Sequence, residues 1–305
     1  MNDSERELLR LVCDGDIRKA QLQARIILNG ICAKKDESFK QNNLRKLDAK
    51  GPSLIELPHN LRELLVAEDV TEFPEERFVL RDNERTAVKK VLSLYRVSAK
   101  LAEMGIPYLP ALLLYGESGC GKTMLARYIA HKAELPFLYV RFSNVVSSYL
   151  GSTQSNIGKI FEYARTSPCV LCFDEIDAVG MSRGQKNDVG EMNRIVIALM
   201  QELDQLRNNS IIVGTTNRFD RLDAALIRRF PLQYEITPLN FSEIENLARK
   251  FFLYAGVNCL EWVGPWCIKN FNELEAASSV VKKCTDVIVQ KLIEPDDFST
   301  LNDVF

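Results

Sequence analysis

An eight-residue segment that starts at Gly116 constrains the fold of this chain more than any other feature of its sequence. It matches the pattern G-x-x-x-x-G-K-[ST] and reads Gly116-Glu117-Ser118-Gly119-Cys120-Gly121-Lys122-Thr123. The apolar run Ala111–Tyr115 precedes it, and the helical pattern Met124–Lys132 follows it. A glycine-rich loop between a strand and a helix presents backbone N–H groups to a phosphate. The segment therefore predicts a P-loop and a nucleotide-binding fold.

Each part of the predicted P-loop has an expected role. Lys122 is expected to reach the β and γ phosphates of ATP, and the Thr123 hydroxyl to ligate Mg²⁺. Cys120 is interpreted as a small spacer. The residues expected to contact the nucleotide are the eight of this segment and the next one: Gly116, Glu117, Ser118, Gly119, Cys120, Gly121, Lys122, Thr123 and Met124. ATP and Mg²⁺ are thus the expected ligands.

Short apolar runs alternate with helical patterns in the middle of the chain. The predicted strands are Ala111–Tyr115, Pro136–Val140, Cys169–Phe173, Ile211–Thr215 and Leu232–Ile236. Such alternation predicts an α/β fold, with a mostly parallel sheet and helices on both faces. The pattern is helical again after residue 240, with predicted helices at Phe241–Tyr254 and Asn272–Leu292 and a break at Gly264-Pro265.

These patterns predict three parts of the chain. Residues 1–60 are expected to form a short helical region followed by a linker. The expected role of this region is to recruit a partner. Residues 61–238 are expected to form the nucleotide-binding α/β part, and residues 239–305 a small helical lid. The expected architecture is a P-loop NTPase sheet followed by this lid.

Polar residues follow two of the predicted strands. Asp174 and Glu175 come directly after Cys169–Phe173, and Asn217 follows Ile211–Thr215. Because ligands bind outside the carboxyl ends of parallel strands, these side chains are expected beside the P-loop. Asp174 is predicted to contact the nucleotide and hold Mg²⁺, Glu175 to polarise the attacking water, and Asn217 to hold that water or sense the γ-phosphate.

Two adjacent arginines, Arg228 and Arg229, end a short helical pattern before the last predicted strand. An arginine suits the charge that develops during phosphoryl transfer, because it is planar and always ionised. Both are therefore candidate catalytic residues that reach the γ-phosphate of a neighbouring subunit. The alternative is a surface pair that stabilises the C-terminus of the helix.

Taken together, these motifs resemble the AAA group of the AAA+ ATPases, the group that contains katanin, spastin and the membrane AAA proteases. The resemblance rests on the P-loop, Asp174-Glu175, Thr216-Asn217-Arg218 and the arginine pair, in this order and spacing, and covers about residues 75–300. It implies a Mg²⁺-dependent ATPase that assembles into a ring, a hexamer, and remodels or threads a protein partner.

The resemblance also implies roles for single residues. Tyr149, Leu150 and Gly151 are similar to the loop that lines the central pore of the ring and grips a polypeptide.

Many family members have Pro-Gly between their two arginines, whereas Arg228 and Arg229 are adjacent here. The sequence therefore leaves open which of the two reaches the neighbouring subunit.

Composition limits the alternatives. The 39 basic and 41 acidic residues give a net charge of −2, which provides no overall field for nucleic acid or an anionic membrane. No apolar run is long enough for a membrane span, so a cytoplasmic protein without a membrane partner is expected. Cys169 and Cys172 are three apart on a strand and point to opposite faces, so they are interpreted as buried side chains and not as metal ligands.

Two other functions remain open from the sequence. One is an ATP-controlled switch or scaffold that regulates a separate partner enzyme, a protease or nuclease, in a stress or defence module. The other is a nucleic-acid motor, which the near-neutral charge disfavours.

Overall fold

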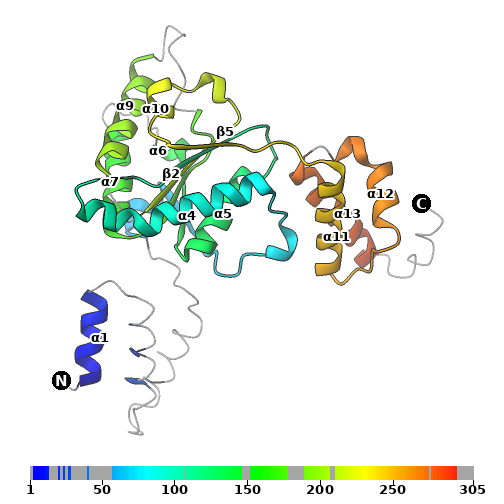
Figure 1. The fold of residues 1–305 in the computed structure, drawn as a ribbon, viewed down its shortest axis with the longest axis horizontal. Helices are drawn as coiled ribbons and strands as arrows, with labels where there is room; N and C mark the ends of the chain where they lie inside the picture. Colours follow the sequence, from blue (N-terminus) through cyan, green and yellow to red (C-terminus); the bar gives the residue numbers. More distant parts are fainter. Residues whose placement is uncertain are drawn as a thin grey trace. The chain divides into compact units, whose positions relative to one another are not determined.

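The computed structural model of the chain describes residues 3–13, 57–106, 108–145, 152–177, 189–206, 210–274 and 276–293, together with residues 20, 23, 24, 27, 28 and 40. The chain divides into two compact units, Met1–Glu56 and Leu57–Phe305 (Figure 1). In the first unit, helix α1 spans Asp3–Cys13, and the Gln23 side-chain amide donates to the Ser4 carbonyl at 3.3 Å.

The second unit contains a six-stranded sheet with the order β1-β3-β4-β5-β2-β6. Its strands are β1 (Leu65–Glu68), β2 (Ala111–Tyr115), β3 (Phe137–Val140), β4 (Val170–Phe173), β5 (Ile211–Thr216) and β6 (Leu232–Glu235). Strands β2 to β6 pair in parallel, and β1 pairs with β3 in the antiparallel sense. The prediction of an α/β fold with a mostly parallel sheet is confirmed.

Strand β1 is an addition that the sequence analysis does not predict. Its four residues follow the buried Leu64, and Leu65 is 1% exposed. The strand is held at both ends, because Arg141 N–H donates to the Leu64 carbonyl at 2.9 Å and Arg127 Nε donates to the Glu68 carboxylate at 2.6 Å. A run this short carries no clear periodicity, and long-range pairing decides its conformation.

Helices cover both faces of the sheet. The helices of the second unit are α4 (Asp82–Glu103), α5 (Lys122–Ala133), α6 (Phe142–Val145), α7 (Ser152–Thr166), α9 (Val189–Gln205), α10 (Ala224–Ile227), α11 (Phe241–Tyr254), α12 (Val263–Lys269) and α13 (Ala277–Ile293). Short 3₁₀ turns are η2 (His59–Leu61), η3 (Glu75–Arg77), η4 (Phe219–Arg221) and η5 (Phe271–Glu273).

Alternate residues of the strands enter two separate layers of the core. Leu112 and Leu114 of β2 pack in one cluster with Leu125 and Ile129 of α5. On the other face, the Phe173 ring stacks on Phe161 of α7 with 5.6 Å between ring centroids. The residues of β2 and β4 are therefore apolar almost without interruption, as both faces of a parallel strand are covered.

Helices α11, α12 and α13, called the lid below, have a hydrophobic core of their own. It includes Leu247, Phe252 and Trp266, which are at most 4% exposed. The predicted break at Gly264-Pro265 is wrong, since both residues lie in the first turn of α12. Proline is tolerated there because its missing N–H would have no partner within the helix. The last helix begins at Ala277 and not at Asn272, because the η5 turn comes first.

We expect Phe252→Ala to destabilise the lid by about 3–5 kcal/mol, because the mutation leaves a cavity beside two aromatic rings. Phe252 is fully buried, 4.9 Å from Trp262 and 5.5 Å from Trp266 between ring centroids. These are the two tryptophans of the chain, so urea unfolding followed by tryptophan fluorescence reports the lid. The control is Leu253→Ala at the neighbouring position, which is 49% exposed. Equal shifts in both variants would contradict this assignment of the lid core.

Candidate nucleotide site

The loop Gly116–Gly121 joins strand β2 to helix α5, which begins at Lys122. Gly116, Gly119 and Gly121 have φ values of 141°, 80° and 101°, in the region that side chains with a Cβ rarely adopt. A Cβ atom on Gly116 would lie 2.1 Å from the Ile236 carbonyl oxygen. Glycine is therefore required at the start of the loop for two reasons. It permits the positive φ, and it leaves room for the Ile236 carbonyl, which follows β6.

The Lys122 side chain connects the loop to the end of strand β5. Its Nζ donates to the carbonyls of Gly116 at 3.0 Å and Glu117 at 2.7 Å, and to Asn217 Oδ1 at 2.6 Å. Lys122 is 7% exposed, and burial lowers its pKa, whereas nearby acidic groups act in the opposite direction. Such a buried ammonium group needs several acceptors. The structure thus brings Lys122 and Asn217 together, as the sequence analysis expects.

Asp174 lies next to the first turn of α5. Thr123 Oγ1 is 3.1 Å from each of its carboxylate oxygens, and the Thr215 hydroxyl also donates to it. A hydroxyl and a carboxylate side by side are oxygen ligands of the kind that Mg²⁺ prefers. The donor set fits Mg²⁺, and Thr123 and Asp174 are the residues that would hold it.

Glu175 has an unusual backbone conformation. Its φ is 51°, a left-handed value that is uncommon for a residue other than glycine. Two hydrogen bonds hold it in place, from Glu175 N–H to Thr215 Oγ1 at 3.2 Å and from Ile176 N–H to the Thr215 carbonyl at 2.9 Å. Residues in strained conformations persist where neighbours fix them, and they concentrate at functional sites. The Glu175 side chain is exposed and so accessible to a ligand.

Three residues that support this site, Thr215, Thr216 and Tyr139, have no role predicted from the sequence. Thr215 contacts both Asp174 and Glu175, and the Thr216 hydroxyl donates to Asp177 Oδ1 at 2.6 Å. Burial raises the pKa of Tyr139 on strand β3, and the nearby Asp174 carboxylate raises it further. Two adjacent threonines at the carboxyl end of a buried strand were the available signal. Tyr139 carried no signal, because its proximity depends on strand order.

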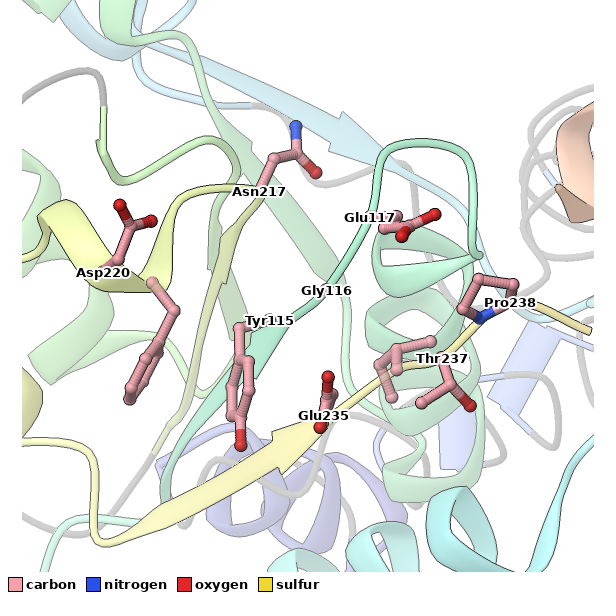
Figure 2. Close-up of a pocket in the computed structure, with 10 residues that line it drawn as sticks. Tyr115, Gly116, Glu117, Asn217, Asp220, Glu235, Thr237 and Pro238 are labelled. Atoms are coloured by element: carbon pink, nitrogen blue, oxygen red, sulfur yellow. The ribbon is translucent and has the colours of Figure 1, made fainter.

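A cavity of about 400 Å³ opens beside the start of the P-loop (Figure 2). Its lining residues are Tyr115, Gly116, Glu117, Asn217, Phe219, Asp220, Glu235, Ile236, Thr237 and Pro238. The Tyr115 and Phe219 rings lie with centroids 4.3 Å apart and form one apolar wall. The cavity includes Gly116, Glu117 and Asn217, so it adjoins the predicted nucleotide contacts.

The other residues predicted to contact the nucleotide lie in the P-loop and at the start of α5. Cys120 is 4% exposed, and burial raises the pKa of its thiol. The Gly119 carbonyl accepts a hydrogen bond from Ser278 N–H of the lid at 3.2 Å. Ser118 is exposed, and Met124 lies in the first turn of α5. The loop is thus contacted from the lid as well as from the sheet.

The two candidate arginines have different surroundings. Arg229 is engaged within the chain, because Nε and Nη2 donate to the Asp204 carboxylate at 3.0 and 2.8 Å, and Nη1 donates to the Ala225 carbonyl at 2.8 Å. Arg228 is exposed, and its guanidinium has no hydrogen bond or ion pair with any residue that the structure describes. Within that part of the chain, neither side chain bonds to the P-loop.

Some predicted residues lie elsewhere. Tyr149, Leu150 and Gly151 are outside the described residues. Cys169 and Cys172 are fully buried, and burial raises the pKa of Cys169 to about 12 and that of Cys172 well above its usual value. The described segments contain no group of three or more histidine, cysteine or acidic residues that is suited to a metal ion.

The fold and the site together define a P-loop NTPase. A strand, the glycine-rich loop and α5 present Lys122, and the ends of β4 and β5 present Asp174 and Asn217.

In the described parts of the chain, no helix is long and apolar enough to cross a lipid bilayer.

Known proteins are similar to this chain. The model of the family described as "ATPase family associated with various cellular activities (AAA)" matches residues 112–238. An uncharacterized AAA family ATPase of Sinorhizobium fredii is 35% identical over 211 residues, which are 64% of this chain and 64% of that protein. The chain therefore contains an AAA ATPase domain, and the resemblance described from the sequence is confirmed at that level.

Two relatives with more specific names are much longer than the matched region. The proteasome-activating nucleotidase of Methanosphaerula palustris is 34% identical over 202 residues, which are 63% of this chain and 49% of the relative. The peroxisomal ATPase pex6 of Schizosaccharomyces pombe is 33% identical over 210 residues, which are 67% of this chain and 21% of the relative. The chain therefore spans less than two thirds of the length of both of these relatives and of the Sinorhizobium fredii protein.

Proposed function

We propose that this chain hydrolyses ATP with Mg²⁺ at the site formed by Lys122, Thr123, Asp174, Glu175 and Asn217. The observation that carries the proposal is the convergence on Lys122, whose ammonium contacts the P-loop backbone and Asn217 while Thr123 contacts Asp174. Lys122 and the loop N–H groups bind the phosphates, and Thr123 and Asp174 hold the ion. Bound Mg²⁺ offsets the negative charge of the β and γ phosphates.

Glu175 and Asn217 act on the attacking water. Glu175 is exposed beside Asp174, so its carboxylate can accept a proton from water. Asn217 Oδ1 lies 2.6 Å from Lys122 Nζ, at the phosphate end of the loop, and its amide is suited to orient the same water. The two backbone hydrogen bonds at Glu175 and Ile176 fix the point from which the Glu175 side chain extends.

The proposal includes a ring of subunits, a hexamer, in which Arg228 completes the site of the neighbour. Arg228 is exposed and free of ion pairs with the described residues, whereas Arg229 is held by Asp204. Of the two, Arg228 is available to a second subunit without breaking a bond to a described residue. An arginine supplied in this way offsets the charge that develops on the transferred phosphoryl group.

We propose that the ring acts on a protein partner in the cytoplasm. One relative carries the name proteasome-activating nucleotidase, which supports a role together with a protein partner. Residues 1–60 are proposed to recruit the partner, residues 61–238 to bind the nucleotide, and residues 239–305 to form the lid. Tyr149, Leu150 and Gly151 are proposed to grip the polypeptide in the pore.

We expect Glu175→Gln to retain ATP and to accumulate as a ring of about six subunits, because it binds the nucleotide without hydrolysing it. Light scattering with and without Mg-ATP measures the mass of the assembly. Lys122→Ala is the control, since it should lose nucleotide binding and stay small under both conditions. A Glu175→Gln protein that remains monomeric at saturating ATP would contradict the shared site.

We expect Arg228→Ala to lower kcat by about 10³–10⁵ and to leave nucleotide affinity nearly unchanged. Arg229→Ala should affect kcat far less and lower stability by about 1 kcal/mol or less, because its pair with Asp204 is partly exposed. Steady-state hydrolysis and thermal melting measure both. Mixing Arg228→Ala with Glu175→Gln protein should restore part of the activity, since the first supplies an intact site and the second, which is expected to enter the ring, supplies the arginine. Absence of recovery would rule out an arginine acting in trans.

We expect Tyr149→Ala to leave basal hydrolysis largely intact and to abolish partner remodelling. The substitution removes the predicted grip but no residue of the nucleotide site. ATPase assays are compared with processing of a captured partner, and Lys122→Ala serves as the control that loses both. Unchanged processing by Tyr149→Ala would exclude threading and would favour an ATP-controlled switch.

A further inference from the structure

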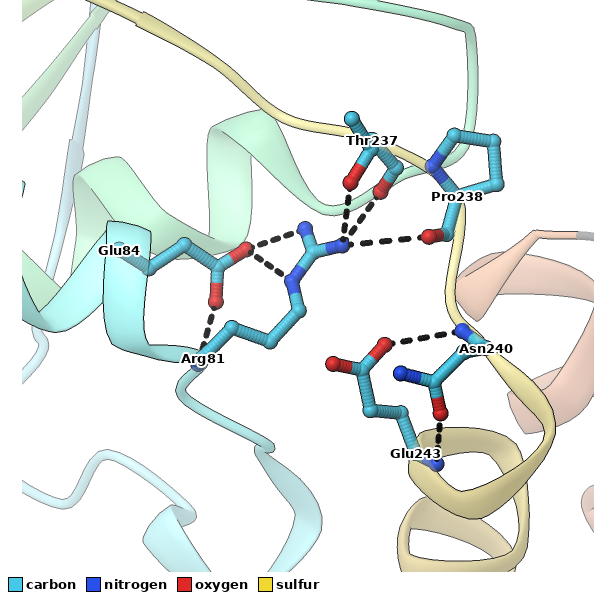
Figure 3. Close-up of polar contacts among 6 residues, drawn as sticks. All are labelled: Arg81, Glu84, Thr237, Pro238, Asn240 and Glu243. Carbon is cyan, nitrogen blue, oxygen red and sulfur yellow. Dashed lines mark hydrogen bonds and ion pairs between the residues drawn. The ribbon is translucent and has the colours of Figure 1, made fainter.

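We propose that Arg81, oriented by Glu84, is a positioning residue for the nucleotide site because it clamps the hinge that joins the sheet to the lid (Figure 3). The hinge consists of residues 236–240, between the end of β6 and the start of α11. The proposal rests on the function proposed above and adds a residue outside the region matched by the AAA family model.

All three nitrogens of the Arg81 guanidinium are engaged. Nη1 donates to the Thr237 carbonyl at 2.5 Å, and to Thr237 Oγ1 and the Pro238 carbonyl at 3.3 Å each. Nε donates to Glu84 Oε1 at 3.0 Å, and Nη2 donates to the same oxygen. Arg81 thus grips two successive residues of the hinge with one edge of its guanidinium and Glu84 with the other.

Glu84 fixes the direction of the Arg81 side chain. It lies in the first turn of α4, and its second oxygen accepts from Arg81 N–H at 2.9 Å. The side chains of Arg81 and Glu84 are 11% and 6% exposed. A buried ion pair persists only where further hydrogen bonds satisfy both groups, and these bonds define one geometry. The pair is therefore a rigid connection between α4 and the hinge.

The hinge is also fixed at both of its ends. Ile236 N–H donates to the Tyr115 carbonyl at 2.7 Å, directly before the P-loop. At the other end, Asn240 Oδ1 accepts from Glu243 N–H at 3.0 Å, and Glu243 Oε2 accepts from Asn240 N–H at 2.9 Å, so helix α11 starts from a capping box (Figure 3). Thr237 and Pro238 are the residues between these two anchors, and Arg81 holds them.

The segment before Arg81 contacts the sheet and the lid alternately. Phe78 and Leu80 pack against the core beneath the sheet, and Val79 packs against the core of the lid. Lys250 Nζ of α11 donates to the Phe78 carbonyl at 3.1 Å. The Arg77 guanidinium lies 4.5 Å from the centroid of the Tyr254 ring, also on α11. Arg81 is thus the last residue of a segment that joins two separately packed cores.

The position of the lid matters for the nucleotide site because the lid contacts the P-loop. Ser278 N–H of α13 donates to the Gly119 carbonyl at 3.2 Å, and a Cβ on Gly119 would lie 2.4 Å from Ser278 Oγ. A small rotation at the hinge would break this contact. Loss of the clamp should therefore let the lid move away from the loop and release the nucleotide faster.

The experiment compares variants of the full chain by the dissociation rate of a fluorescent ADP analogue, by KM and kcat for ATP, and by Tm. Arg81→Met should raise the dissociation rate and KM about tenfold, which is a typical size for the energetic coupling between two separate sites, here the hinge and the P-loop. The change in kcat should be smaller. It should also lower Tm, because Glu84 is left buried without its partner. Arg85→Gln is the control in the first turn of α4, since the Arg85 side chain is 54% exposed and its pair with Asp82 spans 3.9 Å. Its bond to the Leu80 carbonyl, at 3.4 Å, does not reach the hinge.

The double variant Arg81→Met/Glu84→Met separates positioning from stability. Replacing both members of a buried pair by apolar side chains can restore stability, but it cannot restore the bonds to the hinge. We expect Tm to recover and nucleotide release to stay fast. Recovery of both would overturn the proposal, and so would nucleotide kinetics in Arg81→Met like those of Arg85→Gln. If the unmodified chain binds ATP no better than Lys122→Ala, the function proposed above fails instead.

Discussion

The parallel pairing of strands β2, β4, β5 and β6 is the constraint on which the rest of the site depends. Tyr115 at the end of β2 lies opposite Thr216 of β5 on one side and Glu235 of β6 on the other. Because parallel strands end at the same edge, the loops that follow them share one small region. Lys122 then satisfies its buried charge with acceptors from two of these loops. The chemistry of the site is a result of strand order as much as of the glycine-rich loop.

The sequence predicted the parts of this arrangement that depend on local patterns. The five parallel strands, the loop Gly116–Gly121 and helix α11 follow from apolar runs, glycines and helical periodicity, which neighbours along the chain determine. Strand β1 and the start of α13 were missed or misplaced, because pairing with β3 and packing in the lid decide them. Local sequence carries no information on such distant contacts.

The site shows the same division. The pairing of Lys122 with Asn217 could be expected, since both follow parallel strands. The support of Asp174 by Thr215, and the different environments of Arg228 and Arg229, could not. They depend on which helix lies nearby, here α9 with Asp204, and two adjacent arginines look identical in the sequence. The clamp from Arg81 to Thr237 joins residues 156 positions apart, a separation over which no sequence pattern applies.

Strand β1 has a mechanical consequence. In the order β1-β3-β4-β5-β2-β6, the segment that follows the N-terminal unit enters at one edge of the sheet, and the segment that leads to the lid leaves from the other. A load applied between these two attachment points has two routes, one through the strand pairings and one through the contacts of residues 77–81 with the hinge and the lid. The clamp from Arg81 to Thr237 therefore bypasses the width of the sheet and shares that load with its backbone hydrogen bonds.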